Sequence, residues 1–211
     1  MNLEEEGEDL LHLINVTKKQ IIAGIDEVGK GALFGPVFAG AVILKKKSQV
    51  TLIGAGLKDS KLLTSKSRAT LVPLIKQLSM GWGIGEASVN EIELLGIREA
   101  TEKAMLRAIY RLPIEPELLL IDGVLPLRTW EGNQKTLIKG DRYSPEIAAA
   151  SVLAKEARDS LIRDLASTFP KYSLEKNVGY GTEVHREALQ KFGPTKLHRL
   201  SFLSKIISPK K

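Results

Sequence analysis

Along the chain, short apolar runs bounded by turn residues alternate with longer segments of helical periodicity. Three early runs predict strands: residues 20–25 (QIIAGI), 37–44 (VFAGAVIL) and 81–87 (GWGIGEA). Two later runs, residues 118–122 (LLLID) and 136–141 (TLIKGD), predict strands that each end in an aspartate. This strand-first alternation is typical of one α/β domain in which helices cover a central mixed sheet.

Apolar residues recur at steps of three and four, the spacing of helices, in four segments: residues 63–78, 88–109, 145–165 and 183–192. Thr64 or Ser65 is the expected N-cap of the first segment, and Ser88 with Glu91 forms a capping-box pattern at the second. Ser144 precedes a proline at the first position of the third. Small residues in this third helix predict close packing against a neighbouring element.

The chain has 211 residues, enough for one domain with a sizeable core, and it contains no cysteine. Disulfides, thiolate catalysis and sulfur-ligated metals are therefore excluded. The three histidines, His12, His185 and His198, are too few for a histidine-rich metal site, so a bound metal would be held mainly by oxygen. Oxygen ligands favour hard cations such as Mg²⁺ or Mn²⁺.

The formal net charge of +6 is compatible with a polyanionic partner, and equally with an excess of surface lysine. No apolar stretch is long enough to span a bilayer, so we expect no membrane partner. The chain begins with the acidic stretch MNLEEEGEDLL, whereas a secretory signal begins with positive charge. We therefore expect a cytoplasmic protein.

Three aspartates stand at the ends of predicted strands. Asp26 follows the first run, with Glu27 beside it, and Asp122 and Asp141 end the two later strands. Ligands of open α/β sheets usually bind at this edge, where neighbouring strand ends would bring the carboxylates together. Gathered carboxylates repel one another unless they are protonated or neutralised by cations. One such aspartate is more often a turn or capping residue, but three with Glu27 favour a metal site.

Oxygen ligands suit a pair of divalent ions about 4 Å apart, the arrangement used for in-line displacement at phosphorus. Asp26 and Glu27 are consecutive, so in a continuing strand their side chains would face opposite sides. We expect the strand to end there, because Gly29 and Gly31 follow. Glycines also let backbone N–H groups approach a phosphate or a sugar closely.

Two other chemistries fit these residues less well. The phosphate-binding pattern GxxxxGK[ST] is absent, which disfavours a nucleoside triphosphatase. A glycoside hydrolase also uses paired carboxylates, but it would not explain the basic loop Gly29-Lys30-Gly31 beside them.

Six segments resemble, in their order, the ribonuclease HII family, the bacterial type 2 ribonucleases H. They are GIDEVGKGALFGPVFAGAVIL, LKDSKLLT, IDG, KGDRYSPEIAAASVLAKEARD, GYGTEVH and HRLSF, spread over most of residues 23–202. Each motif alone is modest evidence, whereas the ordered set is specific. The resemblance implies an α/β, ribonuclease H-like fold with a central five-stranded mixed sheet flanked by helices and a helical C-terminal extension.

The resemblance divides the chain into three parts. Residues 1–19 are then an acidic N-terminal extension, and residues 20–170 form the ribonuclease H-like catalytic domain. Residues 171–211 form a helical C-terminal part that completes the substrate site and ends in a basic tail.

The implied activity is endonucleolytic hydrolysis of the RNA strand of RNA–DNA hybrids, with two Mg²⁺ or Mn²⁺ ions during catalysis. It includes cutting on the 5′ side of single ribonucleotides embedded in duplex DNA, as in ribonucleotide excision repair, which leaves 3′-hydroxyl and 5′-phosphate ends. The implied partners are RNA–DNA hybrids and ribonucleotide-containing duplex DNA. We expect a monomer, and the residues leave a contact with a replication clamp open.

Carried over by motif, the catalytic and metal-binding residues are Asp26, Glu27, Asp122 and Asp141. The loop Gly29-Lys30-Gly31 corresponds to a Gly-Arg-Gly loop that reads the ribose 2′-hydroxyl, largely through its backbone. Tyr180 corresponds to the residue that stacks on the sugar of the following deoxynucleotide. Together they would identify an RNA-to-DNA junction, because the 2′-hydroxyl distinguishes RNA from DNA.

Further polar residues are weaker candidates for contacts to substrate phosphates: Lys58, Ser60, Lys61, Lys155, Arg158, His198 and Arg199. Surface ion pairs or structural roles are the competing interpretations. Asp159 is a candidate supporting acid near the site. The competing interpretation is a solvent-exposed ion pair with Lys155 or Arg163. His185 is expected to be structural, and Trp82 and Trp130 are expected to pack against protein rather than stack on bases.

Lys30 stands where the family usually has arginine, which keeps the charge but loses the planar, bidentate fork. Two other functions stay open: a resolvase-like DNA endonuclease of the same superfamily, and a nucleic-acid-binding protein with an inactive site. The four carboxylates argue against the inactive protein, since a binding protein has no use for negative charge where phosphates lie. The loop and Tyr180 argue against an enzyme that cuts only DNA.

Overall fold

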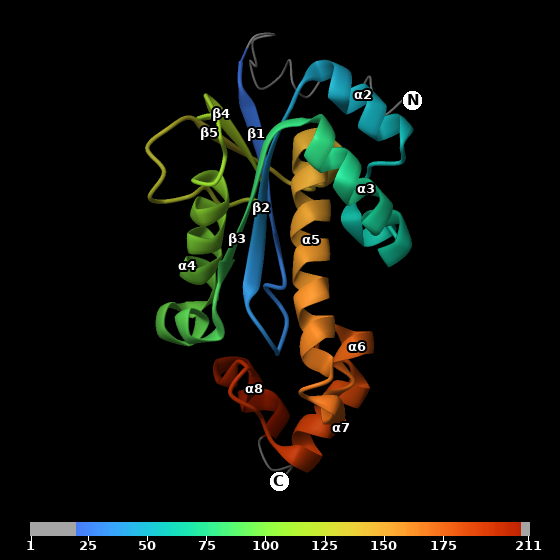
Figure 1. Cartoon of the computed structure of the whole chain (residues 1–211). Coiled ribbons are helices and arrows are strands. Elements are labelled where there is room, and N and C mark those ends of the chain that lie inside the picture. Colours follow the sequence, from blue (N-terminus) through green and yellow to red (C-terminus); the bar gives the residue numbers. More distant parts are fainter. Residues whose placement is uncertain (1–19, 208–211) are drawn as a thin grey trace.

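The computed structural model describes residues 20–207 (Figure 1). The predicted acidic extension, residues 1–19, and the end of the predicted basic tail, residues 208–211, lie outside the described residues. The strands are β1 (Ile22–Val28), β2 (Val37–Leu44), β3 (Ser79–Ala87), β4 (Leu118–Asp122) and β5 (Gln134–Leu137).

The α-helices of this range are α2 (Lys46–Gly54), α3 (Ser65–Leu78), α4 (Val89–Ile109), α5 (Pro145–Ala166), α6 (Leu174–Asn177), α7 (Glu183–Phe192) and α8 (Leu200–Ile207). Three short 3₁₀ helices are η1 (Ser60–Leu62), η2 (Gly140–Arg142) and η3 (Pro170–Tyr172). Between residues 20 and 207, no helix is both long and apolar enough to cross a membrane.

The five strands form one mixed sheet in the order β3-β2-β1-β4-β5. β2 pairs antiparallel with β1 and β3, whereas β4 pairs parallel with β1 and β5. The pairing of β1 with β4 ends at Ile25 opposite Ile121, so Asp26 and Asp122 are the next residues along the two strands. The predicted five-stranded mixed sheet is confirmed.

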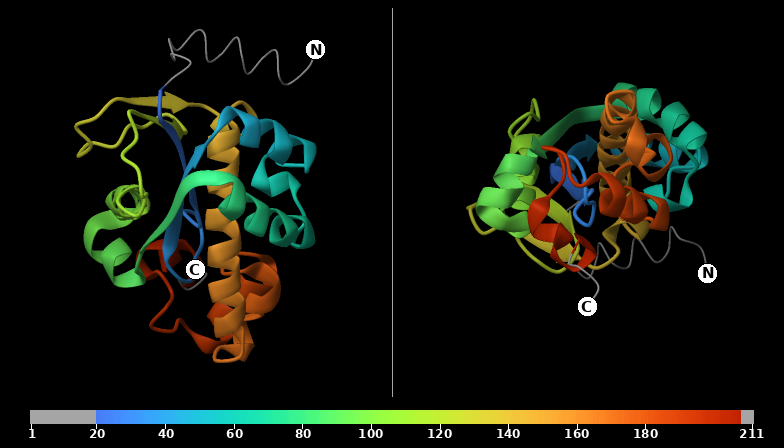
Figure 2. Two further views of the ribbon diagram at one scale, coloured as in Figure 1. Left: turned by 45° about the horizontal axis from the view of Figure 1, so that its top comes forward. Right: turned by 90° about the horizontal axis from the view of Figure 1, so that it is seen from below.

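Helices cover both faces of the sheet (Figure 1, Figure 2). α4 packs on one face, and α5 with α2 and α3 covers the other. Side chains of β2 alternate between the two cores: Ala41 and Ile43 belong to the core on the α4 side, and Val42 and Leu44 to the core on the α5 side. β2 is therefore buried along its whole length, which explains its uninterrupted apolar sequence.

α5 approaches the sheet at backbone distance, where the strands carry glycine. A Cβ atom at Gly24 would lie 2.2 Å from the backbone of Glu146, and one at Gly40 would lie 2.3 Å from the carbonyl oxygen of Ala150. Neither contact is sterically possible, so both positions require glycine in this packing. The close neighbour predicted for this helix is the sheet itself.

The predicted N-caps are present. The side chains of Thr64, Ser88 and Ser144 accept hydrogen bonds from the third backbone amide of α3, α4 and α5, and Ser88 with Glu91 forms the predicted capping box. Within α4, Gly96 leaves the helical conformation with a φ of 78°, which divides the long predicted helix at a kink.

Other boundaries differ from the predictions. β1 does not end at Asp26 but runs to Val28, because β2 continues to pair with it. The strand predicted to reach Asp141 ends at Leu137, since Lys139 adopts a left-handed conformation and Asp141 lies in η2. α2 was not predicted, and its sequence KKSQVTLIG carries no clear apolar stripe.

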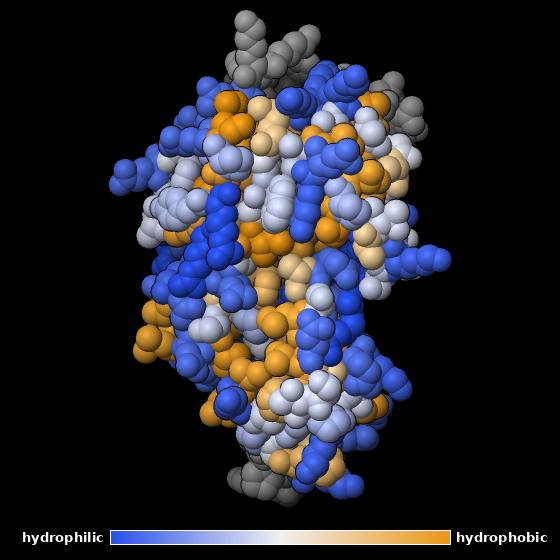
Figure 3. All heavy atoms as spheres, viewed as in Figure 1, coloured by the Kyte–Doolittle hydropathy of each residue, from blue (hydrophilic) through white to orange (hydrophobic). Residues whose placement is uncertain are grey.

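β3 lies at one edge of the sheet. The space-filling view shows apolar side chains along the middle of this face of the molecule (Figure 3). Trp82 of β3 is partly exposed, and the Nζ atom of Lys76 lies 4.4 Å from its ring centroid. Trp130 packs against the core on the α4 side. Both tryptophans therefore pack against protein, as predicted.

The C-terminal helices α6, α7 and α8 gather at one end of the molecule, beside the loop that connects β1 and β2 (Figure 1). In that loop Phe34 forms an isolated β-bridge with His198, and the N–H of Leu33 donates to the carbonyl oxygen of Gly179 at 2.8 Å. Leu33 and Phe34 share an apolar cluster with Leu189. The C-terminal part is thus packed directly on the loop that follows β1.

His185 and His198 form a buried pair in this part of the protein. The N–H of Thr195 donates to Nδ1 of His198 at 2.9 Å, so Nε2 of His198 carries a proton and donates to Nε2 of His185 at 3.1 Å. Nδ1 of His185 then donates to the carbonyl oxygen of Tyr180 at 2.9 Å. Burial lowers the pKa of both rings, and the neighbouring His185 helps to lower the pKa of His198 to about 4.

We predict that acidification from pH 7 to pH 5 destabilises the protein through this pair. Unfolded His198 has its ordinary pKa of 6.5, so between 6.5 and about 4 the unfolded state binds more protons than the folded state. His198 alone should lower the free energy of unfolding by on the order of 2 kcal/mol over this interval. Urea unfolding of the wild type and of His198→Asn at both pH values measures the effect. Equal losses in the two proteins would contradict the assignment.

Candidate active site

Asp26 is buried where β1 extends beyond its pairing with β4. Its side chain faces α5 and hydrogen-bonds the hydroxyl of Ser151, and its Oδ1 accepts from the backbone N–H of Glu27 at 2.7 Å. Burial raises the pKa of Asp26 well above its ordinary value, and repulsion by Glu27 and Asp122 adds to the rise. The contact with Ser151 lowers this pKa in part. The fold therefore holds this carboxylate where a bound cation would be favourable.

Asp122 and Asp141 lie beside Asp26. Asp122 ends β4, and its Oδ1 accepts from the N–H of Gly140 at 2.7 Å, which ties it to the turn that carries Asp141. Burial raises the pKa of Asp141, and the nearby carboxylates of Asp59 and Asp122 raise it further. Three aspartates that are far apart in the sequence thus share one site, although Asp141 reaches it from η2 rather than from a strand end.

Sequence reasoning missed a further carboxylate, Asp59, in the LKDSK segment. Asp59 is buried, accepts from the N–H of Lys61 at 2.9 Å and lies near Asp141, whose pKa it helps to raise. Burial alone would lower the pKa of Lys61, but the carboxylates of Asp26, Asp141, Asp59 and Asp122 outweigh it and raise this pKa. Lys61 is therefore a cation that faces the cluster. The available signal was an acid between two lysines, which equally describes an exposed loop.

Glu27 faces the opposite side of β1 from Asp26. The prediction that the strand ends at these residues was wrong, and side chains alternate along β1 up to Val28. The carboxylate of Glu27 instead lies 3.6 Å from Nζ of Lys30, in a partly exposed ion pair. The three aspartates share one face, and Glu27 adds its charge from the other.

The donor chemistry of this cluster fits a divalent cation. Asp26, Asp122 and Asp141 offer the carboxylate oxygens that Mg²⁺ and Mn²⁺ prefer. The raised pKa values of Asp26 and Asp141 reflect burial first and repulsion between neighbouring carboxylates second, and a bound cation would offset both. As the side chains stand, no group of three or more His, Asp or Glu within the described part of the chain is arranged to hold one ion. Ligation therefore requires these carboxylates to reorient.

The loop Gly29-Lys30-Gly31 forms a turn directly after β1. The N–H of Ala32 donates to the carbonyl oxygen of Gly29 at 3.1 Å, and Gly29 has a φ of 85°. A Cβ atom at Gly29 would lie 2.1 Å from Nε of Arg158, whereas one at Gly31 would meet nothing within 4 Å. Gly29 is therefore required by packing and conformation, while Gly31 leaves open space next to the backbone.

Two arginines expected to contact phosphates are instead fully buried. Arg158 donates to three backbone carbonyls at 2.9–3.2 Å, those of Phe34, Pro36 and Val178. Arg199 donates to two more at 3.0 and 2.9 Å, those of Lys30 and Gly35. Burial lowers the pKa of both side chains, that of Arg199 to about 9 with a contribution from Arg158. Since neither guanidinium is open to solvent, we correct their role to fixing the loop after β1.

Tyr180 lies next to this loop, because the carbonyl oxygen of the preceding Gly179 accepts from the loop's N–H groups at Leu33 and Phe34. The ring of Tyr180 is half-buried, and two cations lie against it. Cζ of Arg158 is 5.2 Å and Nζ of Lys155 is 5.4 Å from the ring centroid. The structure thus places the glycine loop and Tyr180 side by side.

The remaining candidates divide by exposure. Lys58 is exposed and precedes Asp59 of the carboxylate cluster, so its side chain is open to a phosphate. Ser60 is buried, with its hydroxyl 2.7 Å from that of Ser151, and His198 is buried in the histidine pair, so neither presents a free face to phosphate. Asp159 is neither solvent-exposed nor free, because it lies buried in an ion-pair network between α3 and α5.

The sequence model of the family described as Ribonuclease HII matches residues 23–205. The chain is 63% identical over 189 residues to a Ribonuclease HII of Prochlorococcus marinus, and the match covers 90% of this chain and 99% of that protein. At this identity and coverage the two proteins share a family.

Solved structures show the same fold. The ribonuclease HII in the PCNA complex from Archaeoglobus fulgidus has a TM-score of 0.75 and 25% identity, covering 90% of this chain and 98% of that one. Bst-RNase HIII in complex with Mn²⁺ has a TM-score of 0.67 and 18% identity, covering 90% of this chain and 71% of that one. The chain therefore belongs to the ribonuclease HII family and is a ribonuclease H, a hydrolase.

Proposed function

We propose that this ribonuclease H cuts on the 5′ side of single ribonucleotides embedded in duplex DNA, as well as within longer RNA–DNA hybrids, leaving 3′-hydroxyl and 5′-phosphate ends. The observation that carries the proposal is the continuity of β1 with the turn that follows it. Asp26 and the open backbone at Gly31 lie five residues apart on one segment. A phosphate at the carboxylates would therefore have its neighbouring sugar near the turn.

Asp26, Asp122 and Asp141 would hold two Mg²⁺ or Mn²⁺ ions, and Glu27 would join them once its side chain leaves Lys30. When bound, such ions lower the pKa of the attacking water and stabilise the leaving oxygen. The Mn²⁺ complex of Bst-RNase HIII, a protein of the same fold, supports this assignment. Once bound metal neutralises the carboxylates, Lys61 would turn from them to a phosphate of the substrate. The exposed Lys58 would contact a second phosphate.

The backbone of Gly29-Lys30-Gly31 would read the 2′-hydroxyl, and Tyr180 would stack on the next deoxyribose. Arg199 and Arg158 support this role indirectly, because their hydrogen bonds to backbone carbonyls fix the loop and the segment before Tyr180. Reading by a rigid backbone suits a sugar hydroxyl, which needs one donor or acceptor at a fixed distance. In this proposal residues 20–170 cut, and the C-terminal part from residue 171 completes the reading of the substrate.

The proposal is tested with duplex DNA that carries one ribonucleotide, beside an all-DNA duplex of the same sequence, in the presence of Mg²⁺ or Mn²⁺. We expect cleavage of the first substrate alone, directly 5′ of the ribonucleotide. Equal cutting of both duplexes would favour a DNA endonuclease. Binding without cutting under either metal would favour an inactive nucleic-acid-binding protein.

We predict that Asp26→Asn lowers cleavage by at least about 100-fold, because changes even in the outer shell of a metal site cost about 10–100-fold. The same variant should raise the melting temperature of the metal-free protein, since it removes a buried charge whose pKa the fold raises. Asp141→Asn should also abolish cleavage, and exposed Asp164→Asn on α5 is the matched control. Calorimetry with Mn²⁺ reports binding independently of activity. Full activity of both site variants would show that the ligands are misassigned.

For Lys30→Arg we predict equal or higher kcat/KM on the single-ribonucleotide duplex. The side chain of Lys30 is half-exposed, and the loop is held through its carbonyl oxygen by Arg199, so the substitution leaves the backbone in place. Arginine adds a planar fork that can hold a phosphate by two hydrogen bonds. Steady-state kinetics of the two proteins at one salt concentration measure the effect. A large loss would mean that the loop is built around lysine.

A further inference from the structure

The ring of Tyr180 rests on two cations that are held in different ways. Arg158 is fixed by three backbone carbonyls and is fully buried. Lys155, one turn earlier on α5, has a carboxylate partner instead: its Nζ lies 2.8 Å from Oδ1 of Asp159. A cation within about 6 Å of an aromatic centroid attracts the ring face, so the position of Nζ affects where the ring settles.

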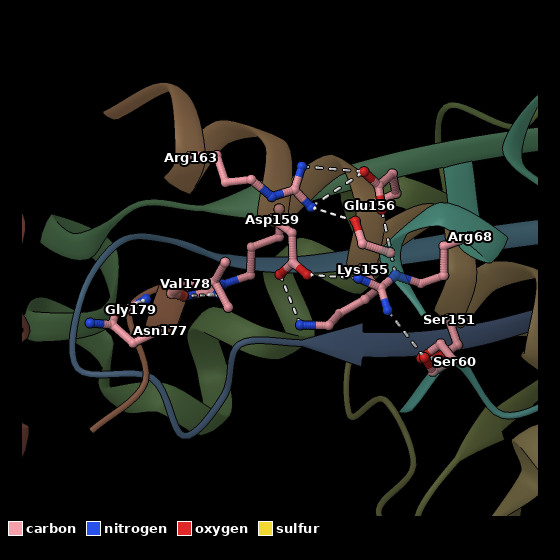
Figure 4. Close-up of polar contacts among 12 residues, drawn as sticks. Ser60, Arg68, Ser151, Lys155, Glu156, Asp159, Arg163, Asn177, Val178 and Gly179 are labelled. Carbon is pink, nitrogen blue, oxygen red and sulfur yellow. Dashed lines mark hydrogen bonds and ion pairs between the residues drawn. The ribbon is translucent and has the colours of Figure 1, made fainter. Parts of the chain in front are cut away.

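Asp159 holds Lys155 from a buried position (Figure 4). Its second oxygen, Oδ2, lies 3.1 Å from Nη2 of Arg68 on α3, so the carboxylate bridges two cations from two helices. The side chains of Asp159 and Arg68 are only 4% and 8% exposed. Buried ion pairs carry a large desolvation cost and contribute little net stability. The role of this network is therefore better explained by the side-chain positions that it fixes than by added stability.

The network continues toward the carboxylate cluster. Nη1 of Arg68 donates to the carbonyl oxygen of Leu63 at 2.9 Å and lies 3.5 Å from that of Ser60. The hydroxyl of Ser60 lies 2.7 Å from that of Ser151, which in turn hydrogen-bonds Asp26. Polar side chains thus lie one after another from Lys155, beside Tyr180, to Asp26, the carboxylate proposed to bind metal.

We propose that Lys155, Asp159 and Arg68 are positioning residues that set the ring of Tyr180 relative to Asp26. The inference rests on the proposed function, in which Tyr180 stacks on the deoxyribose that follows the ribonucleotide. Cutting at an RNA-to-DNA junction requires the scissile phosphate and this sugar to be engaged together, so the separation of Asp26 and Tyr180 has to be fixed. The network links the two through α3 and α5.

The first test removes the charge of Lys155 while keeping its length. Lys155→Met should lower kcat/KM on a single-ribonucleotide duplex by about three- to tenfold, the range of a partly buried cation–π contact. The loss should be smaller on a uniform RNA–DNA hybrid, where no deoxyribose follows the cut, and Lys155→Arg should restore most of the activity. Lys191→Met removes a comparable cation from the ring of Phe192, 5.3 Å away, and is the matched control.

A double-mutant cycle separates positioning from a structural role. If Lys155 acts through the ring, Lys155→Met should change the junction preference less than twofold in a Tyr180→Ala background. Equal losses on both substrates, or an undiminished effect without the ring, would overturn the proposal. Asp159→Asn should reproduce the pattern of Lys155→Met, and if that variant does not fold, the half-buried Lys155 variants decide the question alone.

A readout without cleavage keeps this inference distinct from the proposed function. In the metal-free protein with ¹³C-labelled tyrosine, the ring signals of Tyr180, assigned with Tyr180→Phe, should shift in Lys155→Met and stay unchanged in Lys191→Met. Unchanged signals in both variants would overturn the positioning role, whatever the enzyme cuts. Shifted signals together with equal cutting of DNA and ribonucleotide-containing duplexes would support positioning and contradict the proposed function.

Discussion

The backbone approach of α5 to β1 and β2 is the constraint on which the site depends. Gly24 and Gly40 allow it, because any Cβ atom there would overlap the backbone of the helix. At this distance α5 can present Ser151 to Asp26, Lys155 to Tyr180 and Arg158 to the loop after β1. These three lie at steps of four and three, so one helix face lies against the carboxylates, Tyr180 and the loop after β1.

Around this helix the protein buries charge where an apolar core would be easier to stabilise. Arg158 and Arg199 use their donors on backbone carbonyls of loops, and Asp159 bridges two cations inside the structure. The desolvation of such groups is costly, but each makes two or three directional hydrogen bonds. Segments without regular structure thereby acquire fixed positions.

Local signals were sufficient for much of the fold. The capping residues Thr64, Ser88 and Ser144 were visible because a cap depends on a few neighbouring residues. β2 was predicted with its observed bounds, since it is apolar on both faces and follows a Gly-Pro turn. The acids Asp26 and Asp122 were visible for a similar reason: each follows an apolar run in the sequence and stands out from it.

The sequence by itself determined the order of elements, the absence of sulfur ligands and the family motifs, because these depend on residue type and short spacing. Only the tertiary structure decided which charged side chains are buried and which are exposed. Arg158 contacts Phe34 across 124 residues and Arg199 contacts Lys30 across 169, so their burial follows from partners that no local pattern contains. The extension of β1 past Asp26 and the approach of Asp59 to Asp141 also required long-range pairing. The sequence states the type of each side chain, whereas long-range packing determines which groups surround it.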